Sequence, residues 1–222
     1  MRVLAVSDEV SAHLWTDDAA RYQPDLVAGC GDVPFDLLTW LAAVTEAPLV
    51  FVPGNHDPDL SGYRQTRRGL VLRAGIPVES PWPAGAINAD GRVVDVGGLR
   101  VAGLGGSPRY RPGPNQYTER QQARRARRLV IRARWKRPRA RVDLVITHAP
   151  LAGVGDSDDL AHHGFDALRY LVSALQPRLF LHGHVAPAGG SIEHRVGTTR
   201  VVNVFDHQVL DLDCPTAPTA GR

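Results

Sequence analysis

Short apolar runs alternate with polar, glycine-rich turns along this chain of 222 residues. The first half predicts strands over 2–6, 25–29 and 49–52, with helices near 12–21 and 35–46 between them. The second half predicts strands over 142–147, 178–182, 192–196, 200–205 and 208–212, with a helix over 165–175. Runs such as Leu144-Val145-Ile146 have no polar position on either face, which is typical of parallel strands buried on both sides. The pattern therefore predicts an α/β protein.

The middle of the chain is less regular. Residues 58–90 are rich in Gly and Pro, with one possible helix over 62–74. Residues 92–96 and 99–104 predict a hairpin, because Gly97-Gly98 supplies the positive φ angles of a two-residue turn. A helix is expected from Glu119 to about 137, with Thr118 and Gln121 as a capping box and Pro138 ending it.

Five polar motifs follow the predicted strands directly. They are Ser7-Asp8-Glu9-Val10, Gly31-Asp32, Gly54-Asn55-His56-Asp57, Thr147-His148-Ala149-Pro150 and His182-Gly183-His184-Val185. In α/β proteins the carboxyl ends of parallel strands are where ligand-binding groups gather. Carboxylate, amide and imidazole groups are suited to divalent metals, so the motifs predict a metal site.

The order and spacing of these motifs resemble the calcineurin-like metallophosphoesterase superfamily over nearly the whole chain. The stretch from His148 through Asp156 to Gly164 and on to the pair Gly183-His184 is similar to one uncharacterised bacterial branch of it. The segments 103–107 and 113–118 are similar to the same branch. The resemblance implies a four-layer α/β sandwich, in which two mixed β-sheets pack face to face and helices flank them. It also implies hydrolysis of a phosphomonoester or phosphodiester by a metal-bound hydroxide.

Carried over residue by residue, the resemblance implies one complete metal site and one depleted site. Asp32 would bridge the two ions, and Asn55, His148 and His184 would complete one site. Asp8 would serve the other, where the family's two further histidines are replaced by Val10 and Ala186. The resemblance also makes His56 the group that protonates the leaving oxygen, and Asp57 could orient its ring.

Two surrogates could fill the depleted site. Glu9 adjoins Asp8, and the pair Asp206-His207 follows a strand that ends near the site in the resembled fold. Without them, that site would bind Mg²⁺ or Mn²⁺ weakly through carboxylates and water. The complete site suits Mn²⁺, Fe²⁺ or Zn²⁺, so we expect one or two divalent ions.

Composition is consistent with a single globular domain over 1–214 and a frayed tail over 215–222. The chain is 43% hydrophobic and has two cysteines, Cys30 and Cys214, too few for a disulfide framework. No apolar run approaches the roughly 20 residues needed to span a bilayer, and the amino terminus leads straight into a strand. We therefore expect a cytoplasmic protein without membrane association, and the sequence leaves its oligomeric state open.

The predicted helix after Thr118 is strongly basic. Eleven Arg or Lys and no acidic residue lie between Arg120 and Arg141. An apolar stripe of Ala126, Leu129, Val130 and Ala133 should face the core. The outward arginines, among them Arg124, Arg125, Arg127 and Arg128, are either a solvated face or a polyanion-binding surface, for instance for nucleic acid. The acidic run 156–159 either pairs with these arginines or lies at the rim of the active site.

Three hypotheses follow from the sequence. The protein is a phosphoesterase acting on a phosphorylated small molecule or nucleotide. Alternatively, it is a degenerate relative that binds one metal and a phosphorylated or polyanionic ligand without efficient turnover. In the third hypothesis the metal site is vestigial and the basic helix contacts nucleic acid or a protein.

Overall fold

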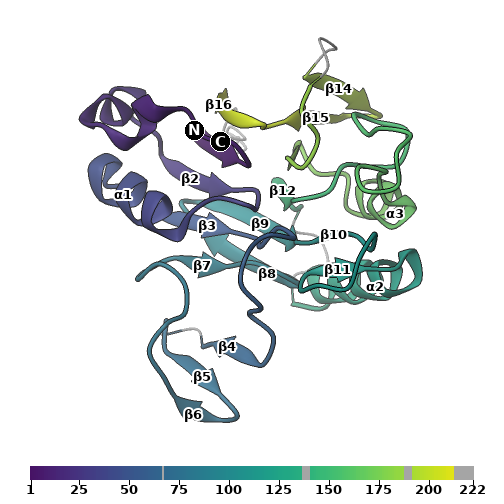
Figure 1. Ribbon diagram of the computed structural model, residues 1–222, viewed down its shortest axis with the longest axis horizontal. Coiled ribbons are helices and arrows are strands. Elements are labelled where there is room, and N and C mark those ends of the chain that lie inside the picture. Colours follow the sequence, from purple (N-terminus) through teal and green to yellow (C-terminus); the bar gives the residue numbers. More distant parts are fainter. Residues whose placement is uncertain (67, 137–140, 188–191, 213–222) are drawn as a thin grey trace, which may run out of the picture.

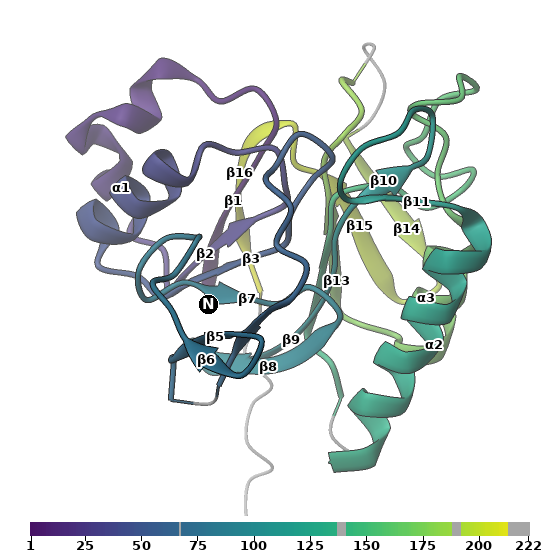
Figure 2. The same ribbon diagram turned by 60° about the horizontal axis from the view of Figure 1, so that its bottom comes forward.

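Two mixed β-sheets packed face to face form the centre of the protein. The computed structural model describes residues 1–66, 68–136, 141–187 and 192–212. The expected tail over 215–222, Cys214 and Pro138 lie outside these residues. Figures 1 and 2 show the helices on the outer faces of the two sheets, which confirms the predicted four-layer α/β sandwich.

The first sheet has the strand order β16-β1-β2-β3-β7. Its strands are β1 (Arg2–Ser7), β2 (Leu26–Gly29), β3 (Leu49–Phe51), β7 (Ile87–Asn88) and β16 (Asp206–Asp211). The pairs from β1 to β7 are parallel, whereas β16 runs antiparallel to β1 with Ser7 opposite Asp206. The carboxyl ends of β1, β2 and β3 therefore meet at one edge of the molecule.

The second sheet has the order β14-β15-β13-β12-β9-β8. It contains β8 (Arg92–Val96), β9 (Leu99–Leu104), β12 (Leu144–Thr147), β13 (Leu179–His182), β14 (Glu193–Val196) and β15 (Thr199–Asn203). Its four central strands are parallel, and the predicted hairpin over 92–104 is confirmed, with Gly97 and Gly98 at φ of 56° and 77°.

Three apolar clusters separate the four layers. The first lies between the sheets and includes Val3, Val50, Ile146 and Leu181. The second lies between the second sheet and the helices α2 (Glu119–Lys136) and α3 (Asp166–Leu175), and the third lies beneath α1 (Phe35–Thr45). The stripe predicted on α2 is buried as expected, with Ala126 and Leu129 fully inaccessible.

Two predicted helices are wrong. Residues 12–21 form two 3-10 helices, η1 (Ala12–Trp15) and η2 (Asp17–Tyr22), instead of one α-helix. Residues 62–74 contribute to a three-stranded antiparallel sheet of β4 (Tyr63–Gln65), β5 (Val71–Arg73) and β6 (Ile76–Pro77). Gly69 and Gly75 adopt φ near 81° and 84°, a left-handed conformation that forms turns and interrupts a helix.

The pattern also missed a short parallel pair next to the second sheet. β10 (Ser107–Pro108) and β11 (Gln116–Tyr117) pair through two residues each, which is too short for a periodic signal. The capping box of α2 is present, because Thr118 N–H donates to Gln121 Oε1 at 2.9 Å and Gln121 N–H donates to Thr118 Oγ1 at 3.3 Å. Among the described helices, none is long and apolar enough to cross a bilayer.

Candidate metal centre

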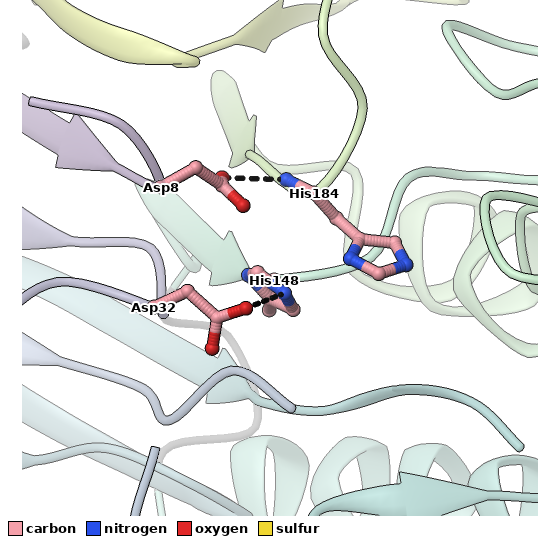
Figure 3. A group of neighbouring side chains, drawn as sticks. All are labelled: Asp8, Asp32, His148 and His184. Carbon is pink, nitrogen blue, oxygen red and sulfur yellow. Dashed lines mark hydrogen bonds and ion pairs between the residues drawn. The ribbon is translucent and has the colours of Figure 1, made fainter. Parts of the chain in front are cut away.

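Four side chains from separate strand ends converge at one edge of the sandwich (Figure 3). Asp8 follows β1, Asp32 follows β2, His148 follows β12 and His184 follows β13. One ligand atom of each lies within 4.8 Å of one ligand atom of every other. The structure therefore brings together four of the five residues predicted as metal ligands, two from each sheet.

Asp8 links the two sheets at this edge. One of its oxygens, Oδ2, accepts a hydrogen bond from Ser7 Oγ at 2.6 Å and another from the backbone N–H of His184 at 2.7 Å. These bonds leave its other oxygen able to face the group. The backbone of Asp8 is left-handed, with φ of 59°, which turns the side chain away from the strand direction.

The carboxylate of Asp32, like that of Asp8, is fixed by a backbone N–H group. Its Oδ1 accepts the backbone N–H of His56 at 2.7 Å, and its Oδ2 lies 3.2 Å from His148 Nε2. Burial would raise the pKa of Asp32, but the hydrogen bond and charge of His148 outweigh it, so the pKa is lowered. The carboxylate is therefore anionic and available to a cation.

His148 is fully buried. Its Nδ1 donates to the carbonyl oxygen of Cys30 at 2.9 Å, which directs Nε2 toward Asp32 and toward Asn55 Oδ1 at 3.0 Å. Burial alone would lower the pKa of His148, whereas the hydrogen bond and charge of Asp32 raise it to about 9. The site thus favours a positive charge between these residues, which either a proton or a metal ion can supply.

His184 presents its ring edge to the same space. Its Nε2 donates to the carbonyl oxygen of Ala161 at 2.8 Å, so Nδ1 faces the other members of the group (Figure 3). Burial, followed by the charge of His148, lowers the pKa of His184 to about 4. A neutral imidazole with one nitrogen anchored is the form in which histidine binds a metal.

The motif glycines are explained by crowding around these side chains. A Cβ at Gly54 would overlap the carboxylate of Asp32, and a Cβ at Gly183 would overlap Ser7 Oγ and the carboxylate of Asp8. A Cβ at Gly31 would lie 2.6 Å from His148 Nδ1. Side-chain-free positions are therefore needed for the donors to approach one another.

Asn55 completes the predicted ligand set. Its Oδ1 contacts His148 Nε2, and its Nδ2 donates to the hydroxyl of Tyr110 at 3.3 Å. The loop that carries Asn55 is anchored by Asn115, whose Nδ2 donates to the carbonyl of Gly54 at 2.9 Å. Tyr110 and Asn115 were not predicted as site residues; the only signal for Asn115 was its place in the segment resembling the bacterial branch.

Asp57 has a different environment from the one expected. Its Oδ2 accepts the backbone N–H groups of Asp32 at 2.9 Å and Gly54 at 2.7 Å. Burial raises the pKa of Asp57 to about 6 against the effect of these bonds. Among the described residues it makes no hydrogen bond to the ring of His56, so its visible role is to fix two loops of the site.

His56 lies at the exposed side of the group. Its backbone binds Asp32, and its side chain lines a shallow pocket of about 390 Å³ together with Asp32, Phe35 and Asp57. The pocket therefore opens beside one of the donors, Asp32.

Neither predicted surrogate belongs to the donor group, although both lie in the described part of the chain. Glu9 is exposed, and His207 Nε2 lies 3.1 Å from the hydroxyl of Tyr22. Asp206 is engaged by the backbone N–H and Oγ of Ser11 at 2.8 and 2.5 Å. Val10 packs into the cluster beneath α1, which places an apolar side chain where the family has a ligand.

The acidic run 156–159 lies at the rim of the site. Asp156 Oδ2 accepts the N–H groups of Gly153 and Gly164 at 2.9 and 3.0 Å, closing a loop that includes Ala161, the partner of His184. Asp159 binds the ring of His162 at 2.9 Å. No ion pair joins the run to the arginines of α2 within the described residues, so the rim interpretation is the one that agrees with the structure.

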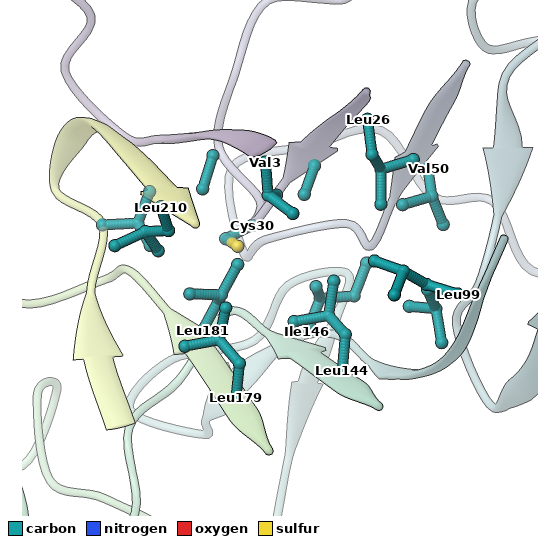
Figure 4. Packing of buried hydrophobic residues seen from close by; sticks show 14 of the residues in the cluster. Val3, Leu26, Cys30, Val50, Leu99, Leu144, Ile146, Leu179, Leu181 and Leu210 are labelled. Atoms are coloured by element: carbon teal, nitrogen blue, oxygen red, sulfur yellow. The ribbon is translucent and has the colours of Figure 1, made fainter. Parts of the chain in front are cut away.

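Cys30 contributes its backbone to the site and its thiol to the core. Figure 4 shows it among the apolar side chains between the sheets, beside Val3 and Leu181. Burial raises the pKa of its thiol, which keeps the sulfur protonated. Its carbonyl oxygen orients His148, so the residue supports the site through its backbone.

A four-layer sandwich with carboxylates and imidazoles at the strand ends of both sheets defines an α/β protein with a candidate site for a divalent metal. The family model of calcineurin-like phosphoesterases matches residues 10–188, and the chain belongs to this family. The resemblance inferred from the motifs is confirmed. Metal-dependent hydrolysis of phosphate esters is the activity that the family suggests.

Solved structures share the fold at low sequence identity. The protein TT1561 of Thermus thermophilus is 18% identical, with a TM-score of 0.62 over 95% of this chain and 94% of that chain. A second solved structure is 16% identical, with a TM-score of 0.63 over 96% of this chain and 99% of its own. No match was found among curated proteins.

Proposed function

We propose that this protein is a metal-dependent phosphoesterase that hydrolyses a phosphomonoester or phosphodiester. The observation that carries the proposal is the convergence of Asp8, Asp32, His148 and His184 within 4.8 Å in a chain of this family. Family membership supplies the reaction class, and the donor group supplies a place where it can occur.

The donor set fits a divalent cation. Asp32, Asn55, His148 and His184 would hold one ion, and Asp8 would contribute a carboxylate at its edge. Mixed oxygen and imidazole donors suit Mn²⁺, Fe²⁺ or Zn²⁺, whereas a purely oxygen-ligated position would suit Mg²⁺. When bound, such an ion lowers the pKa of water and polarises a phosphoryl oxygen.

The residues of the chain would complete the reaction. His56 lines the pocket beside Asp32, where its imidazole can donate a proton to the departing alcohol oxygen. Asn55 adds a neutral oxygen, so an anionic substrate meets less negative charge than a further carboxylate would create. Tyr110 and Asn115 keep this loop in place through Asn55 and Gly54.

Activity is tested by hydrolysis of an aryl phosphate ester with added Mn²⁺. His56→Ala should lower the rate by about 100-fold or more, the scale of general acid catalysis. His194→Ala on the edge strand β14 is the matched control and should leave the rate unchanged. A wild-type rate equal to that of the buffer, across phosphomonoesters and phosphodiesters and with each candidate metal, would refute the proposal.

A degenerate, binding-only protein is the second candidate. The observation in its favour is that Val10 and Ala186 replace the two histidines by which the family binds its other metal ion. Neither Glu9 nor His207 joins the donor group in their place. If the enzyme is only weakened, Val10→His combined with Ala186→His should raise the rate, because a second ion would gain imidazole ligands. A correctly folded double variant that binds a second ion without any gain in rate supports the binding-only alternative.

A further inference from the structure

A large groove lies between α2, the edges of the two sheets and the small β4–β6 sheet, and none of the four metal donors lines it. We define the α2 groove by Tyr63, Asn88, Arg92, Ile131, Arg132 and Trp135, which are among the residues that line it. Its volume is about 1650 Å³. Small-molecule sites usually enclose roughly 300–1,000 Å³, so the groove has the size of a site for an extended ligand.

Two arginines of the groove have only neutral partners. Arg92 is half buried and donates to the carbonyl oxygen of Asn88 at 2.8 Å and to Gln65 Oε1 at 3.2 Å. Arg132 donates to the carbonyl oxygen of Gly91. Neither forms an ion pair with a described carboxylate. Both guanidinium groups bind carbonyl oxygens of the short segment 88–91 at the end of β7, so two cations without ion-pair partners line the same part of the groove.

The remaining charges make the groove a cation-rich surface. Among its described lining residues are five arginines and three aspartates, and one of the arginines, Arg100, is buried and donates to the carbonyl oxygen of Ala133. One of the aspartates, Asp90, is neutralised by Arg125, whose NH2 lies 2.6 and 2.7 Å from its two oxygens. Arg125 also stacks on Tyr117 at 3.9 Å, so it is not available in the way the sequence predicted.

An exposed aromatic residue adjoins these cations. Trp135 is 82% exposed, and it lies one turn of α2 beyond Arg132 and Ile131, which is itself 60% exposed. Figures 1 and 2 show this end of α2 beside β8. An exposed tryptophan that lines the same groove as two guanidinium groups without ion-pair partners matches the two parts of a nucleotide, the base and the phosphate.

We propose that the α2 groove binds a single-stranded nucleic acid, with Arg92 and Arg132 on its phosphates and a base stacked on Trp135. An acidic peptide would satisfy the arginines but would leave Trp135 without a planar partner. A duplex would present its bases only within the stack, so a single strand is the form that uses both features. The arginines Arg124, Arg127 and Arg128 extend the cationic surface along the exposed face of α2.

Binding is measured by fluorescence anisotropy of a labelled oligothymidylate of about 12 nucleotides, within the range of known single-strand sites. A chelator in the buffer removes any contribution from the metal centre, so the result is independent of phosphoesterase activity. Arg92→Gln with Arg132→Gln should weaken binding about tenfold or more and reduce the salt slope by roughly 1.4, or 0.7 for each phosphate contact. Trp135→Ala should weaken it about 5- to 150-fold, and Trp135→Phe should retain most of the affinity.

The matched controls lie on η1 and η2, at the other side of the first sheet. Trp15→Ala removes another exposed tryptophan, and Arg21→Gln removes another exposed arginine; neither should change the affinity. Thermal unfolding of each variant shows whether the fold is retained, and the Trp135 variants report on the site if the Arg92 change destabilises the protein.

Three outcomes would overturn the proposal. The first is the absence of saturable binding by the wild-type protein, or binding that the Arg and Trp135 variants do not alter. The second is equal displacement of the oligonucleotide by polyglutamate of the same charge, which would assign the surface to acidic protein. The third is a dimer in sedimentation that Trp135→Ala dissociates, which would assign the groove to a second copy of the chain.

Discussion

At the scale of single residues, the candidate metal centre depends on unusual backbone conformations. Asp8, Asp32 and His184 all have positive φ, at 59°, 56° and 71°. Such conformations cost about 1–3 kcal/mol each for residues other than glycine and persist where neighbouring bonds enforce them. Here the bonds are present, because Asp57 holds the N–H of Asp32 and Asp8 holds that of His184. The turns that follow the strands thus set the direction of these metal-donor side chains.

Gly183→Ala should damage the centre through space alone. The added methyl group would overlap Ser7 Oγ and the carboxylate of Asp8, so we expect a loss of stability of about 2 kcal/mol or more together with loss of tight metal binding. Gly62→Ala is the control, because a Cβ at Gly62 would meet no atom within 4 Å. The only expected cost of this change is the strain of an alanine at φ near 82°, about 1 kcal/mol of stability. Urea unfolding and metal analysis measure both effects. Equal stability and metal content of the two variants would contradict this account of the motif glycine.

At the scale of elements, α2 and α3 are joined by a cap that the local sequence does not reveal. The N-terminus of α3 has no capping side chain of its own. Instead, the carboxylate of Glu119 in the first turn of α2 accepts the N–H groups of Asp166 at 3.2 Å and Ala167 at 2.8 Å. The negative charge also lies at the positive end of the helix dipole. The start of one helix therefore fixes the start of the next.

Replacing Glu119 with Ala should lower the free energy of unfolding by about 1 kcal/mol, the usual contribution of an N-terminal cap. Glu119→Gln, which keeps an acceptor and removes the charge, should give a smaller loss. Arg120→Ala, at the exposed neighbouring position, should change stability by less than about 0.5 kcal/mol. Urea unfolding measures the free energy of unfolding of the three variants and of the wild type, and so tests this order of stability. A Glu119→Ala variant as stable as the wild type would show that solvent satisfies these N–H groups equally well.

At the scale of the whole molecule, the candidate metal centre spans the interface between the sheets. Asp8 and Asp32 belong to the first sheet and His148 and His184 to the second, and the Asp8–His184 and His148–Cys30 bonds cross between them. An ion held by all four side chains would clamp the sandwich at this edge. Because the donors meet only after folding, metal binding and stability should be coupled.

Saturating the centre should therefore raise the melting temperature. A metal at about 100 times its dissociation constant stabilises a folded protein by about 2.7 kcal/mol, provided that the unfolded chain does not bind it. We expect a rise in Tm with Mn²⁺ or Zn²⁺ that a chelator reverses and that His184→Ala removes. His163→Ala, an exposed histidine outside the donor group, serves as the control. The same rise in the His184→Ala variant would place the stabilising ion elsewhere.

Comparison with the sequence shows where local pattern is informative. The apolar runs located β1, β2, β3, β12 and β13 to within two residues, because a strand buried on both faces requires apolar side chains at every position. The capping box and apolar stripe of α2 were equally visible, since they depend on spacings of three and four residues. The helix predicted over 62–74 was wrong because left-handed glycines, Gly62 and Gly69 within it and Gly75 directly after it, form turns between short strands.

The sequence alone predicted the four grouped donor residues, the strands that present them and the family to which the chain belongs, because each is visible in short motifs that follow apolar runs. Only the tertiary structure decided that Asp57 fixes backbone amides, that Ala161 anchors His184, and that Glu9 and His207 lie outside the donor group. It also placed Arg92 and Arg132 at one turn beside Trp135. These contacts join residues 20 to 40 or more positions apart, and their partners are selected by the packing of sheets and loops, which no local periodicity encodes.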